Sequence, residues 1–163
     1  MTAYAPSAPS KIGRTQPMAS LRPAALQPHE RPEIDIVAIG NVTLSLYISG
    51  LFQNLGWTTA SAATCAAGEA LLRPGGTAVV ICEETLPDGT WLDIAGLLET
   101  VPDPPALIVV GDIRALEHEV TAQGGFDVLA SPLRESEVMW SVASAWHAWM
   151  QRGEEGGASC DGI

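Results

Sequence analysis

Five short apolar runs alternate with five helical patterns along the middle of the chain, and this alternation restricts the fold more than any other feature. The apolar runs are 34–39, 57–60, 77–83, 106–110 and 126–130, and the helical patterns are 42–55, 62–73, 91–100, 113–123 and 134–151. Parallel neighbouring strands need a right-handed crossover, usually a helix, between them. The sequence therefore predicts an α/β protein of the flavodoxin-like (βα)5 type, a doubly wound parallel sheet with strand order 2-1-3-4-5.

The two ends of the chain differ in composition from this middle part. Residues 1–32 are rich in Pro, Ala and Ser and show no sustained hydrophobic period, which is typical of a disordered tail. Residues 153–163 are rich in Gly and polar residues, which predicts a second flexible tail. Residues 33–152 are left as one domain, a size at which a single hydrophobic core forms readily.

Charge and cysteine usage exclude several functions. Residues 1–32 carry four basic groups and one acidic group, a net charge of +3, whereas residues 33–163 carry four basic and eighteen acidic groups, a net charge of −14. Such an acidic domain would repel phosphate backbones, so we expect no nucleic-acid binding. Three cysteines without CxxC spacing and three scattered histidines predict no disulfide, no metal site and no cofactor. We expect a cytoplasmic protein without membrane contact, because no apolar run approaches the roughly 20 residues that span a bilayer.

Polar or small residues follow the predicted strands at the sheet edge where ligands bind in open α/β folds. These residues are Gly40-Asn41, Glu83-Glu84, Gly111-Asp112 and Ser131-Pro132. The chain has no GxSxG nucleophile elbow, and neither GxGxxG nor a P-loop follows its first strand. We therefore do not expect an enzyme.

The pattern from Ile36 to Pro132 resembles the receiver domain of bacterial two-component response regulators. The resemblance is carried by the apolar strands together with the loop Leu-Pro-Asp-Gly at 86–89 and the segment Gly-Gly-Phe-Asp-Val-Leu-Ala-Ser-Pro at 124–132. In that family, an Asp at the end of the third strand accepts a phosphoryl group. A Mg²⁺ ion held with the help of an acidic pair, a hydroxyl residue and a lysine assist the transfer.

The resemblance places this catalytic set on residues of different chemistry. Glu83 takes the phosphoacceptor position, the acidic pair falls on Gly40 and Asn41, the hydroxyl on Gly111 and the lysine on Ser131. Phosphoryl transfer depends on positioning and charge neutralisation, and Mg²⁺ is usually anchored by carboxylates. The resemblance thus implies a degenerate, non-phosphorylatable receiver, a pseudo-receiver of phosphorelay signalling that acts through protein contacts. It also implies a cis peptide bond before Pro132.

Two other functions stay open. The first is a weakly active receiver in which Glu84 and Asp112 rebuild part of an altered Mg²⁺ and phosphoacceptor site. The second is a flavodoxin-like module that binds a small ligand, such as an anion or a flavin, at the same edge. This second function predicts an open, apolar-lined pocket there, although the nearby carboxylates argue against an anion.

The last predicted helix is a candidate protein interface, because residues 138–151 include no formally charged side chain. Core packing explains the stripe formed by Val138, Val142, Ala145 and Trp149. It leaves a second set, for which we predict contact with a signalling protein or with a second copy of the chain: Met139, Trp140, Ala143, Trp146 and His147. Ordinary packing under a folded-back tail is the alternative.

Overall fold

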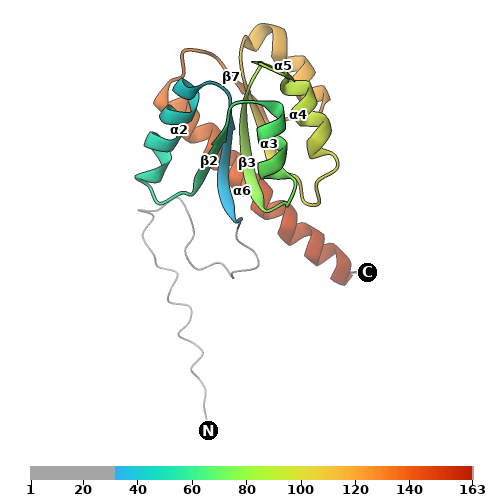
Figure 1. Ribbon diagram of the computed structural model, residues 1–163. Helices are drawn as coiled ribbons and strands as arrows, with labels where there is room; N and C mark the ends of the chain where they lie inside the picture. Colours follow the sequence, from blue (N-terminus) through green and yellow to red (C-terminus); the bar gives the residue numbers. More distant parts are fainter. Residues whose placement is uncertain (1–31, 163) are drawn as a thin grey trace.

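A sheet of five parallel strands runs through the residues that the computed structural model describes, 32–162 (Figure 1). The strands are β1 (Ile34–Ile39), β2 (Thr59–Ala62), β3 (Thr77–Glu83), β6 (Ala106–Val110) and β7 (Asp127–Leu129). Their order in the sheet is β2-β1-β3-β6-β7, which confirms the predicted flavodoxin-like order. In the register of the three central strands, Val79 pairs with Ile36 on one side and with Ala106 on the other.

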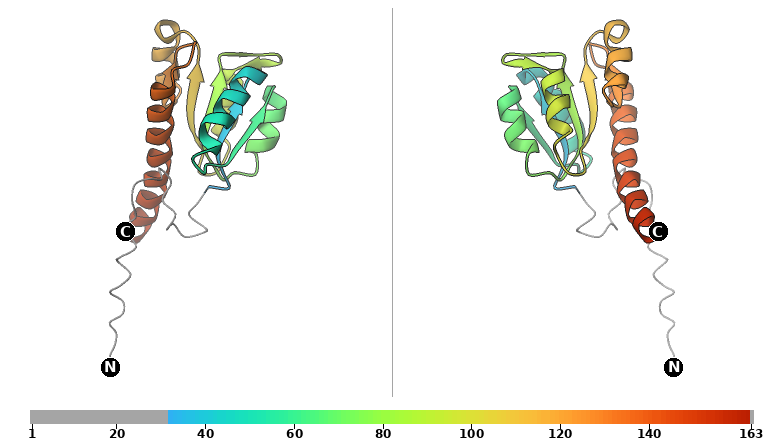
Figure 2. Two further views of the ribbon diagram at one scale, coloured as in Figure 1. Left: turned by 90° about the vertical axis from the view of Figure 1, so that its left-hand side faces the viewer. Right: turned by 90° about the vertical axis from the view of Figure 1, so that its right-hand side faces the viewer.

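Helices cover both faces of this sheet and create two hydrophobic cores. Helices α2 (Val42–Gln53) and α6 (Glu135–Gly162) pack on one face, whereas α3 (Cys65–Leu72), α4 (Trp91–Leu98) and α5 (Ile113–Ala122) pack on the other. Alternate residues of β1 and β3 enter opposite cores, and this explains why the strands are continuously apolar instead of alternating with polar residues. Figure 2 shows that the C-terminal part of α6 projects beyond the strands.

An N-cap side chain and two glycines mark ends of the helices. The side chain of Asp112 accepts a hydrogen bond from the Arg114 amide at 3.1 Å and forms the N-cap of α5. Gly56 and Gly124, which follow α2 and α5, have positive φ values of 85° and 86°. Glycine adopts this conformation without the steric cost that a side chain adds.

The Leu-Pro-Asp-Gly turn forms a small antiparallel hairpin that the sequence analysis did not predict, composed of β4 (Thr85–Leu86) and β5 (Gly89–Thr90). Asp88 at its tip accepts hydrogen bonds from the backbone amides of Cys65 at 2.7 Å and Ala66 at 3.1 Å. These bonds favour the carboxylate form and lower the pKa of Asp88. The hydrogen bonds of Asp88 therefore hold this hairpin, which follows β3, against the N-terminal end of α3.

The C-terminal boundary was predicted wrongly. Helix α6 continues to Gly162, whereas the helical pattern predicted an end at Gln151 and a flexible tail over 153–163. Residues 153–162 contain no proline, so every residue keeps the amide that helix propagation needs. The predicted N-terminal tail, 1–32, lies outside the described residues except for Pro32.

No helix within residues 32–162 combines the length and the apolar character that crossing a bilayer requires.

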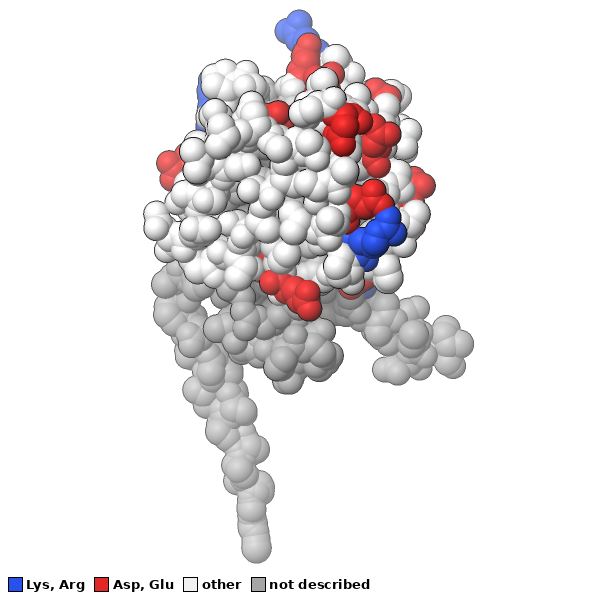
Figure 3. Space-filling model, viewed as in Figure 1, with Lys and Arg blue, Asp and Glu red and all other residues white. Residues whose placement is uncertain are grey.

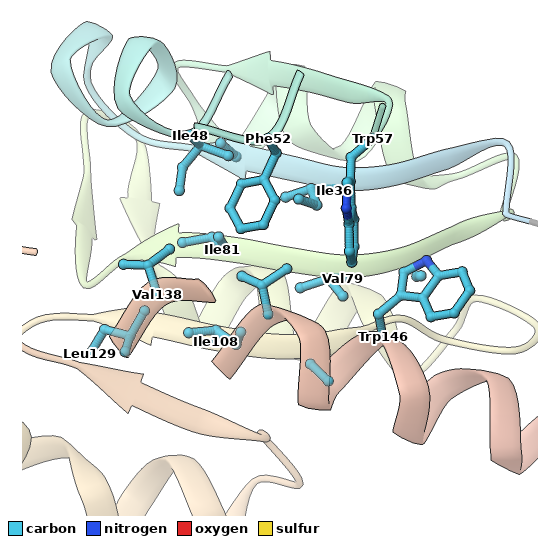
Figure 4. Close-up of a cluster of buried hydrophobic side chains, with 14 of the residues drawn as sticks. Ile36, Ile48, Phe52, Trp57, Val79, Ile81, Ile108, Leu129, Val138 and Trp146 are labelled. Carbon is cyan, nitrogen blue, oxygen red and sulfur yellow. The ribbon is translucent and has the colours of Figure 1, made fainter. Parts of the chain in front are cut away.

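Trp146 was also predicted wrongly, because it belongs to the core and not to an exposed interface. Its side chain is only 2% exposed, and its ring lies 5.8 Å from that of Trp57 in an edge-on arrangement (Figure 4). Its indole N–H donates a hydrogen bond of 3.1 Å to the buried carboxylate of Asp35. The helical period already points to this position, since residue 146 follows Val142 by four on the predicted core stripe.

Candidate functional site

The carboxyl ends of the parallel strands meet at the upper edge of the sheet in Figure 1, where the predicted site residues gather. Asn41, Glu83, Ser131 and Pro132 line one pocket at this edge. The Ser131-Pro132 peptide bond is cis, as predicted. The fold therefore brings together residues that lie up to 91 positions apart (132 − 41).

Glu83 occupies the space beside Gly40 that a side chain would otherwise fill. A Cβ atom built on Gly40 would lie only 2.7 Å from both Cγ and Cδ of Glu83, which is closer than two carbon atoms can approach. The Oε1 atom of Glu83 accepts a hydrogen bond from the Asn41 amide at 3.3 Å. The absence of a side chain at residue 40 thus leaves room for the longer carboxylate of residue 83.

Asn41 serves the start of α2. Its Oδ1 atom accepts a hydrogen bond from the Leu44 amide at 2.9 Å, in the geometry of an N-cap. This oxygen satisfies an amide that lacks a partner within the helix. The position that the receiver resemblance assigns to a metal-binding acid is therefore used here to begin a helix.

A second glycine and carboxylate pair repeats this arrangement on the neighbouring strand. A Cβ atom on Gly111 would lie 2.7 Å from Oε1 of Glu84 and 2.6 Å from Cδ1 of Leu116. Asp112, the other acid of the alternative ion site, is the N-cap of α5. Among residues 32–152, whose side chains the structure describes, no three His, Cys, Asp or Glu side chains are grouped as metal binding requires.

An open pocket of about 320 Å³ lies next to Glu83, between α2 and the segment that joins β7 to α6. It is lined by Asn41, Thr43, Leu44, Tyr47, Glu83, Val110, Ser131, Pro132 and Leu133. Thr43 and Tyr47 were not among the site residues predicted from the sequence. The two residues are four positions apart in α2, so they lie on the same side of the helix. This spacing identifies them as pocket residues only when that side of α2 is known to face the segment between β7 and α6.

Cys82 lies behind Glu83 in the core, where its side chain is fully buried. Burial, with smaller contributions from Cys65 and Glu83, raises the pKa of the Cys82 thiol to about 12. A thiol with this pKa is protonated near neutral pH, and the thiolate is the reactive form. Cys82 is therefore a small core side chain.

The proposed interface on α6 is exposed only in part. Trp140 is 68% exposed and His147 is exposed, whereas Met139 and Ala143 are half-buried. Met139 packs against the core shared by α2 and α6. A shallow groove beside the indole, which we call the Trp140 surface, is lined by Ile113, Asp127, Val128, Leu129, Ser136, Glu137 and Trp140.

Charged residues are distributed unevenly over the molecule. Helix α2 contains no Asp, Glu, Lys or Arg, and it exposes Val42 and Leu46 by 69% and 67%. In Figure 3, the side of the molecule that α2 occupies in Figure 1 is largely white, whereas acidic side chains gather on the opposite side. The face formed by α2 is thus an uncharged surface that exposes apolar side chains.

Comparison with solved structures agrees with the observed topology. The signal receiver domain of an HD domain-containing protein from Pseudomonas fluorescens Pf-5 superposes with a TM-score of 0.67 at 16% identity, over 81% of this chain and 98% of that one. A response regulator receiver domain protein from Clostridium thermocellum gives 0.63 at 18% identity, over 71% and 95%.

The beryllofluoride-activated NtrC4 receiver domain dimer gives a TM-score of 0.63 at 16% identity, over 71% of this chain and 98% of that one. No family model and no curated protein sequence matches the chain. The strand order, the arrangement of helices and these superpositions together show that the chain has the fold of the response regulator receiver domain.

Proposed function

We propose that the chain is a cytoplasmic receiver-like signalling module that works without phosphorylation and without an enzymatic activity of its own, through contact with another protein chain. The observation that carries this proposal is the position of Glu83 beside Gly40. The side chain fills the place of a first metal-binding acid, and Asn41, at the place of the second, caps α2.

Electrostatics supports the loss of phosphoryl transfer. The transfer needs cations that neutralise the charge on the phosphoryl oxygens. No basic side chain lines the pocket at Glu83, and Ser131 stands where the receiver resemblance implies a lysine. Mg²⁺ needs near-octahedral oxygen ligands, and Glu83 supplies the only carboxylate among the residues that line the pocket. The alternative of a weakly active receiver with an altered ion site therefore lacks support in the geometry.

A titration followed by NMR tests this proposal. We expect Mg²⁺ with beryllofluoride, a mimic of the phosphoryl group, to leave the amide signals of Asn41, Glu83 and Gly111 unchanged at millimolar concentrations. The NtrC4 receiver domain, which beryllofluoride activates, is the positive control. Saturable shifts centred on Glu83 that require Mg²⁺ would contradict the proposal and favour the altered ion site.

The Trp140 surface is the proposed contact site, and a second copy of the chain is the partner tested first. Tryptophan is enriched among the residues that dominate binding energy at interfaces. We expect the full chain to self-associate in sedimentation velocity experiments, and we expect Trp140→Ala to weaken this association by at least about tenfold, or about 1.4 kcal/mol.

Leu92→Ala is the matched control, because Leu92 is 42% exposed on α4, on the other face of the sheet. It should leave the association unchanged. A wild-type chain that stays monomeric over the whole concentration range would rule out the homodimer, and an equal effect of both variants would show that the Trp140 surface is not its site.

The pocket beside Glu83 supports a second candidate function, the binding of a small ligand. This candidate predicted an open, apolar-lined pocket at the strand edge, and Leu44, Val110, Pro132 and Leu133 supply such walls. A volume of about 320 Å³ is at the lower end of the range for small-molecule sites, roughly 300–1,000 Å³. Ligand binding here is compatible with protein contact at the Trp140 surface, because the two sites share no lining residue.

A further inference from the structure

The lining of the Glu83 pocket specifies the charge of a ligand. Glu83 is its only formally charged lining residue, and Asn41, Thr43, Tyr47 and Ser131 add neutral polar groups. The remaining lining residues are apolar. A ligand that complements this lining has one positive group and an apolar body.

The Glu83 carboxylate has unused capacity for hydrogen bonds. Its single described hydrogen bond is the one to Oε1 from the Asn41 amide, at 3.3 Å. An ionised carboxylate offers about four acceptor sites. No basic side chain forms an ion pair with Glu83 in the described part of the chain, and the pocket lining contains no Lys, Arg or His. A half-buried carboxylate of this kind is stabilised by a cation brought in by a ligand.

The surroundings of the pocket strengthen this preference. Glu135 lies close enough to Tyr47 to raise the pKa of its phenol, a shift to which burial contributes most. The pocket is thus close to two carboxylates, that of Glu135 at the start of α6 and that of Glu83 at the end of β3. Residues 33–163 together carry a net charge of −14, from four basic and eighteen acidic groups. This field raises the local concentration of cations and lowers that of anions.

We propose that the Glu83 pocket binds an organic cation, a primary ammonium group on a short apolar stem. The ammonium donates hydrogen bonds to the Glu83 carboxylate, and the stem lies against Leu44, Val110 and Leu133. This inference rests on the ligand-binding candidate of the preceding section and gives it a ligand class. It replaces the anion or flavin of the sequence analysis, because the charge at the pocket has the opposite sign to the one that an anion requires.

Three ligands of similar shape and different charge test the inference on the full chain. Phenethylammonium, 2-phenylethanol and 3-phenylpropionate are titrated while amide signals of Asn41, Thr43 and Ser131 are recorded by NMR. We expect phenethylammonium to bind at least about tenfold more tightly than the alcohol, because hydrogen bonds to an ionised acceptor are the stronger ones. The anionic ligand, 3-phenylpropionate, should give no saturable shift of these amide signals.

A pair of variants separates the pocket charge from the general acidity of the protein. Glu83→Gln removes the charge inside the pocket, and we expect it to equalise the affinities for the ammonium and the alcohol. Glu84→Gln removes the neighbouring charge, which lies over Gly111 and outside the pocket, so the preference should persist. A preference for the ammonium that survives in Glu83→Gln, or a wild-type pocket that binds all three ligands equally, would overturn the inference.

The ammonium can come from a free amine or from a lysine side chain, and a fourth ligand distinguishes these sources. Nα-acetyl-lysine N-methylamide should bind more tightly than phenethylammonium if the pocket accepts a protein side chain, and more weakly if it accepts a free amine. Failure of all four ligands to bind would contradict the ligand-binding candidate itself. Binding without charge preference would contradict only the assignment of an organic cation.

Discussion

Replacing Trp146 by alanine is expected to lower the free energy of unfolding by about 3–5 kcal/mol, the range for removing a large buried aromatic side chain. The indole is 2% exposed and contacts Trp57, which in turn lies 5.4 Å from the ring of Phe52. Alanine would leave a cavity between α6 and the sheet. Chemical denaturation followed by circular dichroism measures the loss.

Trp140→Ala is the matched control on the same helix. Trp140 is 68% exposed, so its removal should change the stability of the monomer by no more than about 0.5 kcal/mol. A loss of no more than about 0.5 kcal/mol for Trp146→Ala as well would show that Trp146 does not hold α6 to the sheet. Both tryptophans belong to the set predicted as an interface from the sequence, so a large loss for Trp146 alone would support its place in the core.

Trp146→Phe keeps the protein measurable if the alanine variant does not fold. Phenylalanine retains most of the packing but lacks the N–H that donates to Asp35. The Asp35 carboxylate keeps its hydrogen bonds from the Thr58 amide at 2.8 Å and the Thr58 hydroxyl at 3.0 Å. We expect a loss of about 1–3 kcal/mol, because one buried acceptor loses a donor. A loss below about 0.5 kcal/mol would contradict the role of this hydrogen bond.

Gly40→Ala is expected to destabilise the wild-type protein by about 1–3 kcal/mol, the usual cost of forcing a methyl group into a filled space. The new Cβ would overlap Cγ and Cδ of Glu83 and approach Cδ2 of Leu44 to 2.9 Å. In a Glu83→Ala background most of the overlap disappears. The cost of Gly40→Ala should therefore fall by about 1 kcal/mol, an energetic coupling typical of side chains in contact.

Gly50→Ala supplies the control for this double-mutant cycle. A Cβ atom at Gly50, within α2, meets no atom within 4 Å, so alanine should stabilise the helix by about 1 kcal/mol through its higher helix propensity. Its effect should be the same with and without Glu83. Additive effects of Gly40→Ala and Glu83→Ala would show that the two residues do not share the space, and would remove the geometric basis of the proposed function.

The sequence predicts the sheet because its central strands β3 and β6 are buried on both faces and are therefore apolar along nearly their whole length. The run from Thr77 to Glu83 and the glycines that follow α2 and α5, Gly56 and Gly124, are signals of this kind, since they depend on the backbone and on burial alone. The strand order follows from the crossover rule and the length of the chain. These features need no knowledge of which side chains touch.

The candidate site is less accessible to prediction because it depends on contacts between side chains far apart in the chain. The sequence places Gly40 and Glu83 at the same edge, but it does not show that one fills the space beside the other. Nor does it show that Asn41 turns its oxygen toward Leu44, or that the pocket has Tyr47 as a wall. Trp146 was misplaced because weight was given to residue type at interfaces, although the helical period favoured the core.

The Asp35 network connects β1, the Thr58 segment before β2, and α6 at the end of the strands opposite to the pocket. The Asp35 anchor and the pocket therefore lie at opposite ends of one sheet. We expect substitutions at the carboxyl edge to leave the anchor intact. The same separation makes the domain a scaffold into which a complete phosphoacceptor site could be engineered stepwise, with Glu83 shortened before an acid is introduced at Gly40.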